Sequence, residues 1–147
     1  MNEWLIRKNI MPDSLYIPIS HKIKSIEFII SFLSKINISY YYLLNNKNHN
    51  INENYLVFVD REKECIISIN DILEYEIENS DYPFMVDLKD NNGKDLTLLV
   101  SYLFCNYFGY IVYNDCGVLG KQDSYTSLEL FNLIKSSEYY YLIQQLE

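Results

Sequence analysis

The stretch LTLLVSYLFCNYFGYIVY, residues 96–113, contains no charged side chain. As far as Phe108, its apolar residues recur at the three- and four-residue spacing of one helix face. Asp95 is the expected N-cap of this helix, and Gly109 stands where a left-handed residue ends it. Residues 110–113 are then typical of a short buried strand. The stretch therefore predicts a core helix that runs directly into a strand.

At 18 residues, the same stretch is close to the length of a membrane-spanning helix. Ser101, Asn106 and four tyrosines lower its hydrophobicity, and the flanking Asp95 and Asp115 are acidic where Lys or Arg would be expected. Residues 1–12 lack the long apolar run and the cleavage site of a signal peptide. We therefore expect a cytoplasmic protein with no membrane partner.

Two further helices are expected on either side of this region. Residues 21–36 have helical spacing, with Ser20 as the cap and Asn37 at the end. The second begins with a capping box, Thr126 to Glu129. Residues 138–146 either continue that helix or form a separate turn.

Strands are expected between the helix over residues 21–36 and the core helix that begins at residue 96. Residues 55–59 and 65–69 are β-rich and flank the charged segment 60–64, which predicts a hairpin, and residues 38–44 and 84–88 have the composition of further strands. With 147 residues, the chain fits one domain, residues 1–147. The order of elements indicates an α+β fold, in which a mainly antiparallel sheet carries about three helices on one face.

The segment 71–78 permits two interpretations. As a strand, it would bury Leu73, Tyr75 and Ile77 and display Glu74, Glu76 and Glu78 as a row. As a helix, it would place Asp71, Glu74 and Glu78 on one face. Both interpretations leave the carboxylates exposed.

The net charge of the chain is −8, and its distribution is uneven. Residues 60–95 hold eleven acidic and four basic side chains. Such a surface repels phosphate backbones and attracts basic proteins, so we expect a protein partner and no nucleic acid. The candidate partner-binding residues are Glu74, Tyr75, Glu76, Glu78, Asp81, Tyr82, Asp87, Asp90, Asp115 and Asp123.

The sequence offers little for catalysis or metal binding. Two histidines and three scattered cysteines form no zinc pattern. Residues 117–122 resemble the end of a nucleotide-binding loop, but the glycine spacing is too short, which favours a simple turn. We expect no catalytic residue, metal or cofactor. The alternative is a small hydrolase or transferase that uses Cys116, the thiol expected in a loop.

Tyrosine is abundant, with fifteen residues that include the triplets 40–42 and 139–141. Tyrosine combines a large apolar ring with a polar tip, which suits protein interfaces. The other interpretation is that one or two rings of each triplet face the core, while the rest cover sheet edges.

The chain resembles the immunity proteins of bacterial toxin-immunity systems such as contact-dependent growth inhibition. The resemblance rests on small size, acidity, AT-rich composition and one stretch: the strand 110–113 after Gly109, the loop Asn114-Asp115-Cys116-Gly117, and the capped helix with Leu128-Glu129-Leu130-Phe131. It implies an antitoxin that neutralises the toxin domain encoded by a neighbouring gene, with a basic nuclease as the expected partner. It implies nothing about oligomeric state. An acidic mimic of nucleic acid, which would inhibit several nucleic-acid enzymes, is the competing hypothesis.

Overall fold

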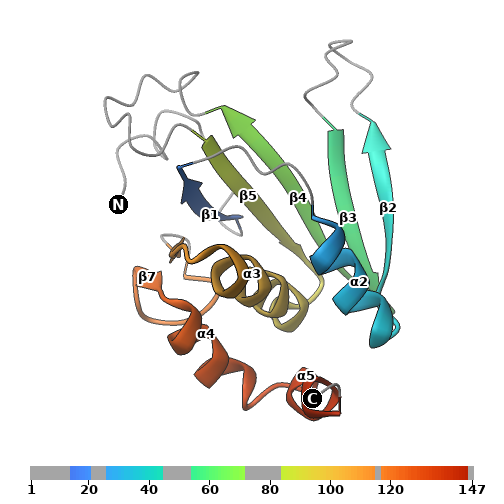
Figure 1. Cartoon of the computed structure of the whole chain (residues 1–147). Coiled ribbons are helices and arrows are strands. Elements are labelled where there is room, and N and C mark those ends of the chain that lie inside the picture. The colour runs from blue at the N-terminus through green and yellow to red at the C-terminus, as the bar shows by residue number, and fades with distance from the viewer. Residues whose placement is uncertain (1–13, 21–25, 45–53, 72–83, 115–116, 146–147) are drawn as a thin grey trace.

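A computed structural model describes residues 14–20, 26–44, 54–71, 84–114 and 117–145 of the chain, which form a single α+β domain (Figure 1). Within these residues, one seven-stranded antiparallel sheet carries four helices. The predicted fold class is therefore confirmed, with one helix more than expected.

The strands follow the order β2-β3-β4-β5-β1-β6-β7 in the sheet. Two of them were not predicted, β1 and the two-residue β7. The sequence of β1 includes Pro18, which weakens a strand signal, yet β1 lies between β5 and β6. The strands are β1 (Ser14–Ile19), β2 (Ser39–Leu44), β3 (Asn54–Asp60), β4 (Lys63–Asp71), β5 (Phe84–Asn91), β6 (Val112–Tyr113) and β7 (Ser124–Tyr125).

β3 and β4 form the predicted hairpin, but its turn is shorter than the expected segment 60–64. Asp60 pairs with Lys63 in the ladder, which leaves only Arg61 and Glu62 in the turn. Arg61 has a φ of 58°, the left-handed conformation that tight hairpin turns require. The predicted turn was too long because cross-strand pairing continues into charged residues that composition alone assigns to a turn.

The starts of α2 (Glu27–Lys35) and α3 (Lys94–Phe108) differ from the predictions, whereas their ends agree. Ile26 occupies the N-cap of α2, so Ser20 does not cap it, and residues 21–25 lie outside the described part of the chain. Gly93 occupies the N-cap of α3, so Asp95 lies in the first turn, where its charge still favours the helix dipole. Asn37, at the end of α2, and Gly109, at the end of α3, have positive φ angles of 65° and 78°.

The C-terminal region forms two helices, α4 (Ser127–Ile134) and α5 (Tyr139–Gln144). The predicted capping box is present, because Thr126 Oγ1 accepts the Glu129 N–H at 3.3 Å and the Glu129 carboxylate accepts the Thr126 N–H at 3.0 Å. Residues 135–138 form turns, so residues after 138 do not continue α4. The strand predicted over 110–113 is reduced to β6, and Ile111 is 43% exposed.

α3 occupies the centre of the structure, between the sheet and α4 (Figure 1). Residues 96–101 are all buried, because the sheet contacts one side of the helix and α4 the other. This position explains the uncharged stretch in the sequence. Within the described residues, no helix has both the length and the hydrophobicity needed to cross a bilayer.

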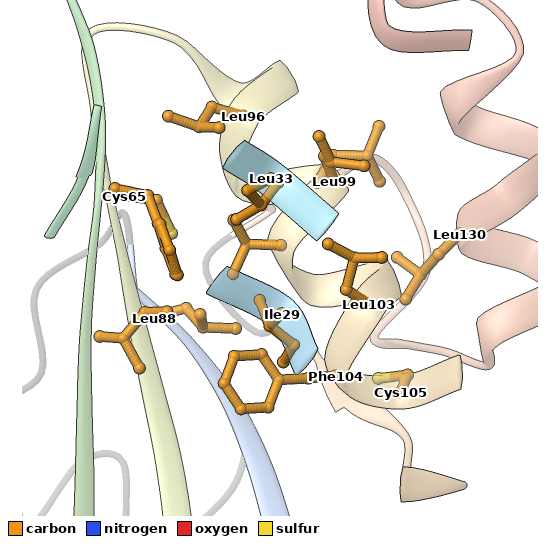
Figure 2. Close-up of a cluster of buried hydrophobic side chains, with 14 of the residues drawn as sticks. Ile29, Leu33, Cys65, Leu88, Leu96, Leu99, Leu103, Phe104, Cys105 and Leu130 are labelled. Carbon is orange, nitrogen blue, oxygen red and sulfur yellow. The ribbon is translucent and has the colours of Figure 1, made fainter. Parts of the chain in front are cut away.

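The main core lies on the helix-covered face of the sheet. Side chains at alternate strand positions meet residues from all four described helices in one cluster, part of which is drawn in Figure 2. Labelled members of this cluster are Ile29, Leu33, Cys65, Leu88, Leu96, Leu99, Leu103, Phe104, Cys105 and Leu130. At full burial, each large aliphatic side chain contributes about 1.5–3 kcal/mol.

The opposite face of the sheet differs in burial from place to place. By strand alternation, Tyr16, Val57 and Met85 belong to this face, and each is 1% exposed. Toward the β3–β4 turn, by contrast, Val59, Glu64 and Ile66 on the same face are only partly buried. We refer to this part of the sheet as its open face.

Candidate functional site

Most residues of the predicted partner-binding set lie outside the described residues. These are Glu74, Tyr75, Glu76, Glu78, Asp81, Tyr82 and Asp115, together with the candidate nucleophile Cys116. The choice between strand and helix for 71–78 also falls mainly there. Asp87, Asp90 and Asp123 are described.

The structure does not bring these three aspartates together on one surface. Asp87 and Asp90 lie on opposite faces of β5, because residues three apart on a strand point in opposite directions. Asp90 faces the helices, where its carboxylate accepts the Thr97 hydroxyl at 2.9 Å. Asp123 is exposed near β7, and its carbonyl accepts the Asn114 N–H at 2.7 Å. Asp90 thus contributes to the packing of α3 on the sheet, and its role in partner binding stays a prediction.

The most exposed aromatic group among the described strands is the tyrosine edge, which we define as Tyr40, Tyr41 and Tyr42 of β2. These side chains are 44%, 45% and 60% exposed. Tyr40 and Tyr42 share one face, with ring centroids 5.9 Å apart in a T-shaped arrangement, and Tyr41 points to the other. None of the three is buried in the core, so the interpretation that one or two rings of each triplet face the core is wrong for this triplet.

The second triplet behaves differently. Tyr139 is 1% exposed, Tyr140 is partly buried, and Tyr141 is 67% exposed. One ring therefore does face the core, as the packing interpretation expects. The contrast follows from position, because β2 ends the sheet whereas α5 packs Tyr139 inward.

Glu64 of β4 is held by donors from two other strands. The Tyr41 hydroxyl donates to Glu64 Oε2 at 3.0 Å, and Asn91 Nδ2 donates to Glu64 Oε1 at 2.7 Å. The bond to Glu64 raises the pKa of Tyr41, since loss of the phenol proton would place two negative charges together. We name these three residues the Glu64 clasp. It lies on the open face of the sheet, next to the tyrosine edge.

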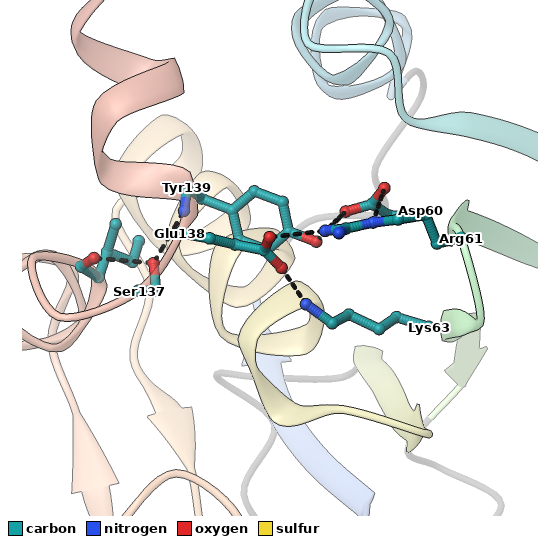
Figure 3. Close-up of polar contacts among 7 residues, drawn as sticks. Asp60, Arg61, Lys63, Ser137, Glu138 and Tyr139 are labelled. Atoms are coloured by element: carbon teal, nitrogen blue, oxygen red, sulfur yellow. Dashed lines mark hydrogen bonds and ion pairs between the residues drawn. The ribbon is translucent and has the colours of Figure 1, made fainter.

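A second polar cluster joins the β3–β4 turn to the start of α5 (Figure 3). Glu138 forms ion pairs with Lys63 and, at 2.6 Å, with Arg61, and the Tyr139 hydroxyl donates to Asp60 Oδ2 at 2.5 Å. Lys63 and Arg61 hold the pKa of Glu138 below its ordinary range. Burial and the bond to Asp60 raise the pKa of Tyr139. The sequence marks residues 60–64 only as a charged turn, and nothing in it identifies Glu138 as the partner.

Asn114 organises the loop that was compared with a nucleotide-binding turn. It is 2% exposed, and its Nδ2 donates to the carbonyls of Gly120 at 3.1 Å and Gln122 at 3.0 Å. Its Oδ1 accepts the Leu119 N–H at 3.0 Å. The Asn114 side chain therefore holds this loop in the form of a turn.

The two described cysteines are core residues. Cys65 is fully buried and Cys105 is 1% exposed, and burial raises the pKa of each thiol to about 12. At neutral pH both are protonated, which makes them poor nucleophiles. In the described ranges no three His, Cys, Asp or Glu side chains gather as a metal-binding group.

A cavity of about 220 Å³ lies between the start of α3 and the connection from α4 to α5. Lys94, Asp95, Leu98 and Ser137 contribute to its lining. The Ser137 hydroxyl donates to the Ile134 carbonyl at 2.8 Å and accepts the Tyr139 N–H at 3.3 Å, so its bonding capacity serves the helix connection.

Comparison of the chain with protein-family models, curated proteins and solved structures gave no match. Within the described residues, the candidate interaction surface combines the tyrosine edge with the Glu64 clasp.

Proposed function

We propose that the protein is an immunity protein that binds and neutralises a cognate toxin domain through the tyrosine edge and the adjoining open face of the sheet. The observation that carries this proposal is the exposure of three consecutive tyrosines on β2. Tyrosine is enriched at protein interfaces because its large ring excludes water while its hydroxyl still forms hydrogen bonds.

The position of the tyrosines supports a protein partner. β2 is the end strand of the sheet, and its sequence SYYYLL contains neither proline nor a charged residue. Edge strands without such protection tend to pair with other chains. A bound toxin domain would cover this edge.

The charge of the chain supports a basic partner. A net charge of −8 accelerates association with a positively charged protein, and toxic nucleases carry positive surfaces to hold nucleic acid. The acidic row of Glu74, Glu76 and Glu78 would add to this attraction and stays a prediction from the sequence.

The test is genetic. The C-terminal part of the protein encoded immediately upstream is expressed in bacteria with and without this protein. We expect toxicity that co-expression relieves, and a complex that co-purifies. A harmless neighbour, or a growth defect that persists, contradicts the proposal.

A triple variant tests the surface. Replacing Tyr40, Tyr41 and Tyr42 with threonine retains strand preference but removes the rings, and we expect toxin binding at least about 30-fold weaker. Tyr141→Ala is the control, because Tyr141 is more exposed than any of the three but lies on α5. Equal affinities of the triple variant and the wild type would exclude the tyrosine edge from the interface.

A further inference from the structure

The Glu64 clasp joins three strands on the open face of the sheet. Tyr41 comes from β2, Glu64 from β4 and Asn91 from β5. In the ladder, Glu64 pairs with Val59 on one side and Asn91 on the other, so these residues form a row across the sheet. One donor holds each carboxylate oxygen, at 3.0 Å and 2.7 Å. The carboxylate is therefore fixed in orientation.

Both donors are neutral, so the charge of Glu64 is not compensated by them. Within the described residues, no Lys or Arg forms an ion pair with Glu64. Arg61 of the adjacent turn and Lys63 at the start of β4 pair instead with Glu138. Lys89, on the same sheet face as Asn91, also forms no ion pair with Glu64.

The surroundings of the carboxylate are partly apolar. Val59 and Ile66 share the open face with Glu64 and are partly buried, and Tyr41 is 45% exposed beside it. A fixed charge bordered by apolar surface gains strength when a partner covers it, because water is excluded from the ion pair.

We propose that Glu64 is the anchor point for an arginine side chain of the toxin. This inference rests on the proposed function and names the contact at its surface. Each carboxylate oxygen has more than one lone pair, so each can accept a guanidinium N–H in addition to its present bond. Arginine suits the site because its planar fork binds a carboxylate through two parallel hydrogen bonds.

The experiment measures binding of the purified upstream-encoded C-terminal domain by titration calorimetry, using full-length wild type, Glu64→Gln and Glu62→Gln. Glutamine keeps the size of the side chain and removes its charge. Glu62 is the matched control, since it is exposed in the adjacent turn and its replacement changes the net charge equally. Thermal unfolding of each variant confirms that the fold is retained.

We expect the Kd of Glu64→Gln to rise about 30-fold and that of Glu62→Gln to stay within about two-fold of wild type. Unchanged affinity of Glu64→Gln overturns the anchor. Equal losses in both variants also overturn it, because general acidity would then explain the effect. Failure of the wild type to bind the neighbour contradicts the proposed function itself, so the two failures are distinguishable.

Discussion

At the scale of the residue, Tyr139 links the C-terminal helix to the sheet through one hydroxyl. Its bond to Asp60 leads us to expect that Tyr139→Phe lowers the free energy of unfolding by about 1.5 kcal/mol at pH 8. The folded state raises the pKa of this phenol above its ordinary value of about 10. Its contribution to stability is therefore complete below pH 10 and declines above it, as the phenol ionises in the unfolded chain.

Denaturant unfolding at pH 8 and pH 11 checks this expectation. The difference in unfolding free energy between wild type and Tyr139→Phe should shrink at the higher pH. Tyr141→Phe is the control, because Tyr141 is 67% exposed and its replacement should change stability little. A constant gap between wild type and Tyr139→Phe would contradict the role of the Asp60 bond.

At the scale of the element, α4 depends on the capping box at its start. Thr126→Ala removes the acceptor for the Glu129 N–H, and we expect a loss of about 1 kcal/mol in unfolding free energy. Ser127→Ala, one position later, keeps the cap and should change stability by less than about 0.5 kcal/mol. Thermal or denaturant unfolding distinguishes them, and equal effects of the two variants would show that the cap is not responsible.

At the scale of the whole molecule, the net charge of −8 should control the rate of association with the proposed toxin partner. We expect the association rate constant to fall at least about ten-fold between roughly 50 mM and 500 mM NaCl, while the dissociation rate changes less. Stopped-flow mixing of the two proteins measures both rates. An association rate that does not respond to salt would contradict electrostatic steering.

Elements with strong local signals could be predicted from the sequence. The end of α3 at Gly109, the hairpin of β3 and β4, and the capping box at Thr126 each depend on residues within a few positions of one another. β1 could not be predicted, because its place between β5 and β6 is decided by distant strands and its own sequence contains Pro18. The starts of α2 and α3 were misplaced because their N-cap residues, Ile26 and Gly93, form no side-chain cap hydrogen bond that the sequence could signal.

The sequence predicted the type of the candidate surface but not the residues that form it. Acidity and abundant tyrosine are properties of the sequence, and they favour a protein interface. The sequence does not determine which tyrosines are exposed, since Tyr40 and Tyr139 belong to similar triplets but are 44% and 1% exposed. The contact of Asp90 with Thr97 could not be predicted either, because it depends on how α3 packs on β5.

The sequence by itself therefore determined the fold class, the long core helix and the acidic character of this protein, because periodicity and charge are local or additive properties. The tertiary structure alone decided the tyrosine edge and the Glu64 clasp. The clasp joins Tyr41, Glu64 and Asn91, which are brought together only when β2, β4 and β5 take their places in the sheet. Such a site depends on strand order and register, which residues far apart in the chain determine jointly.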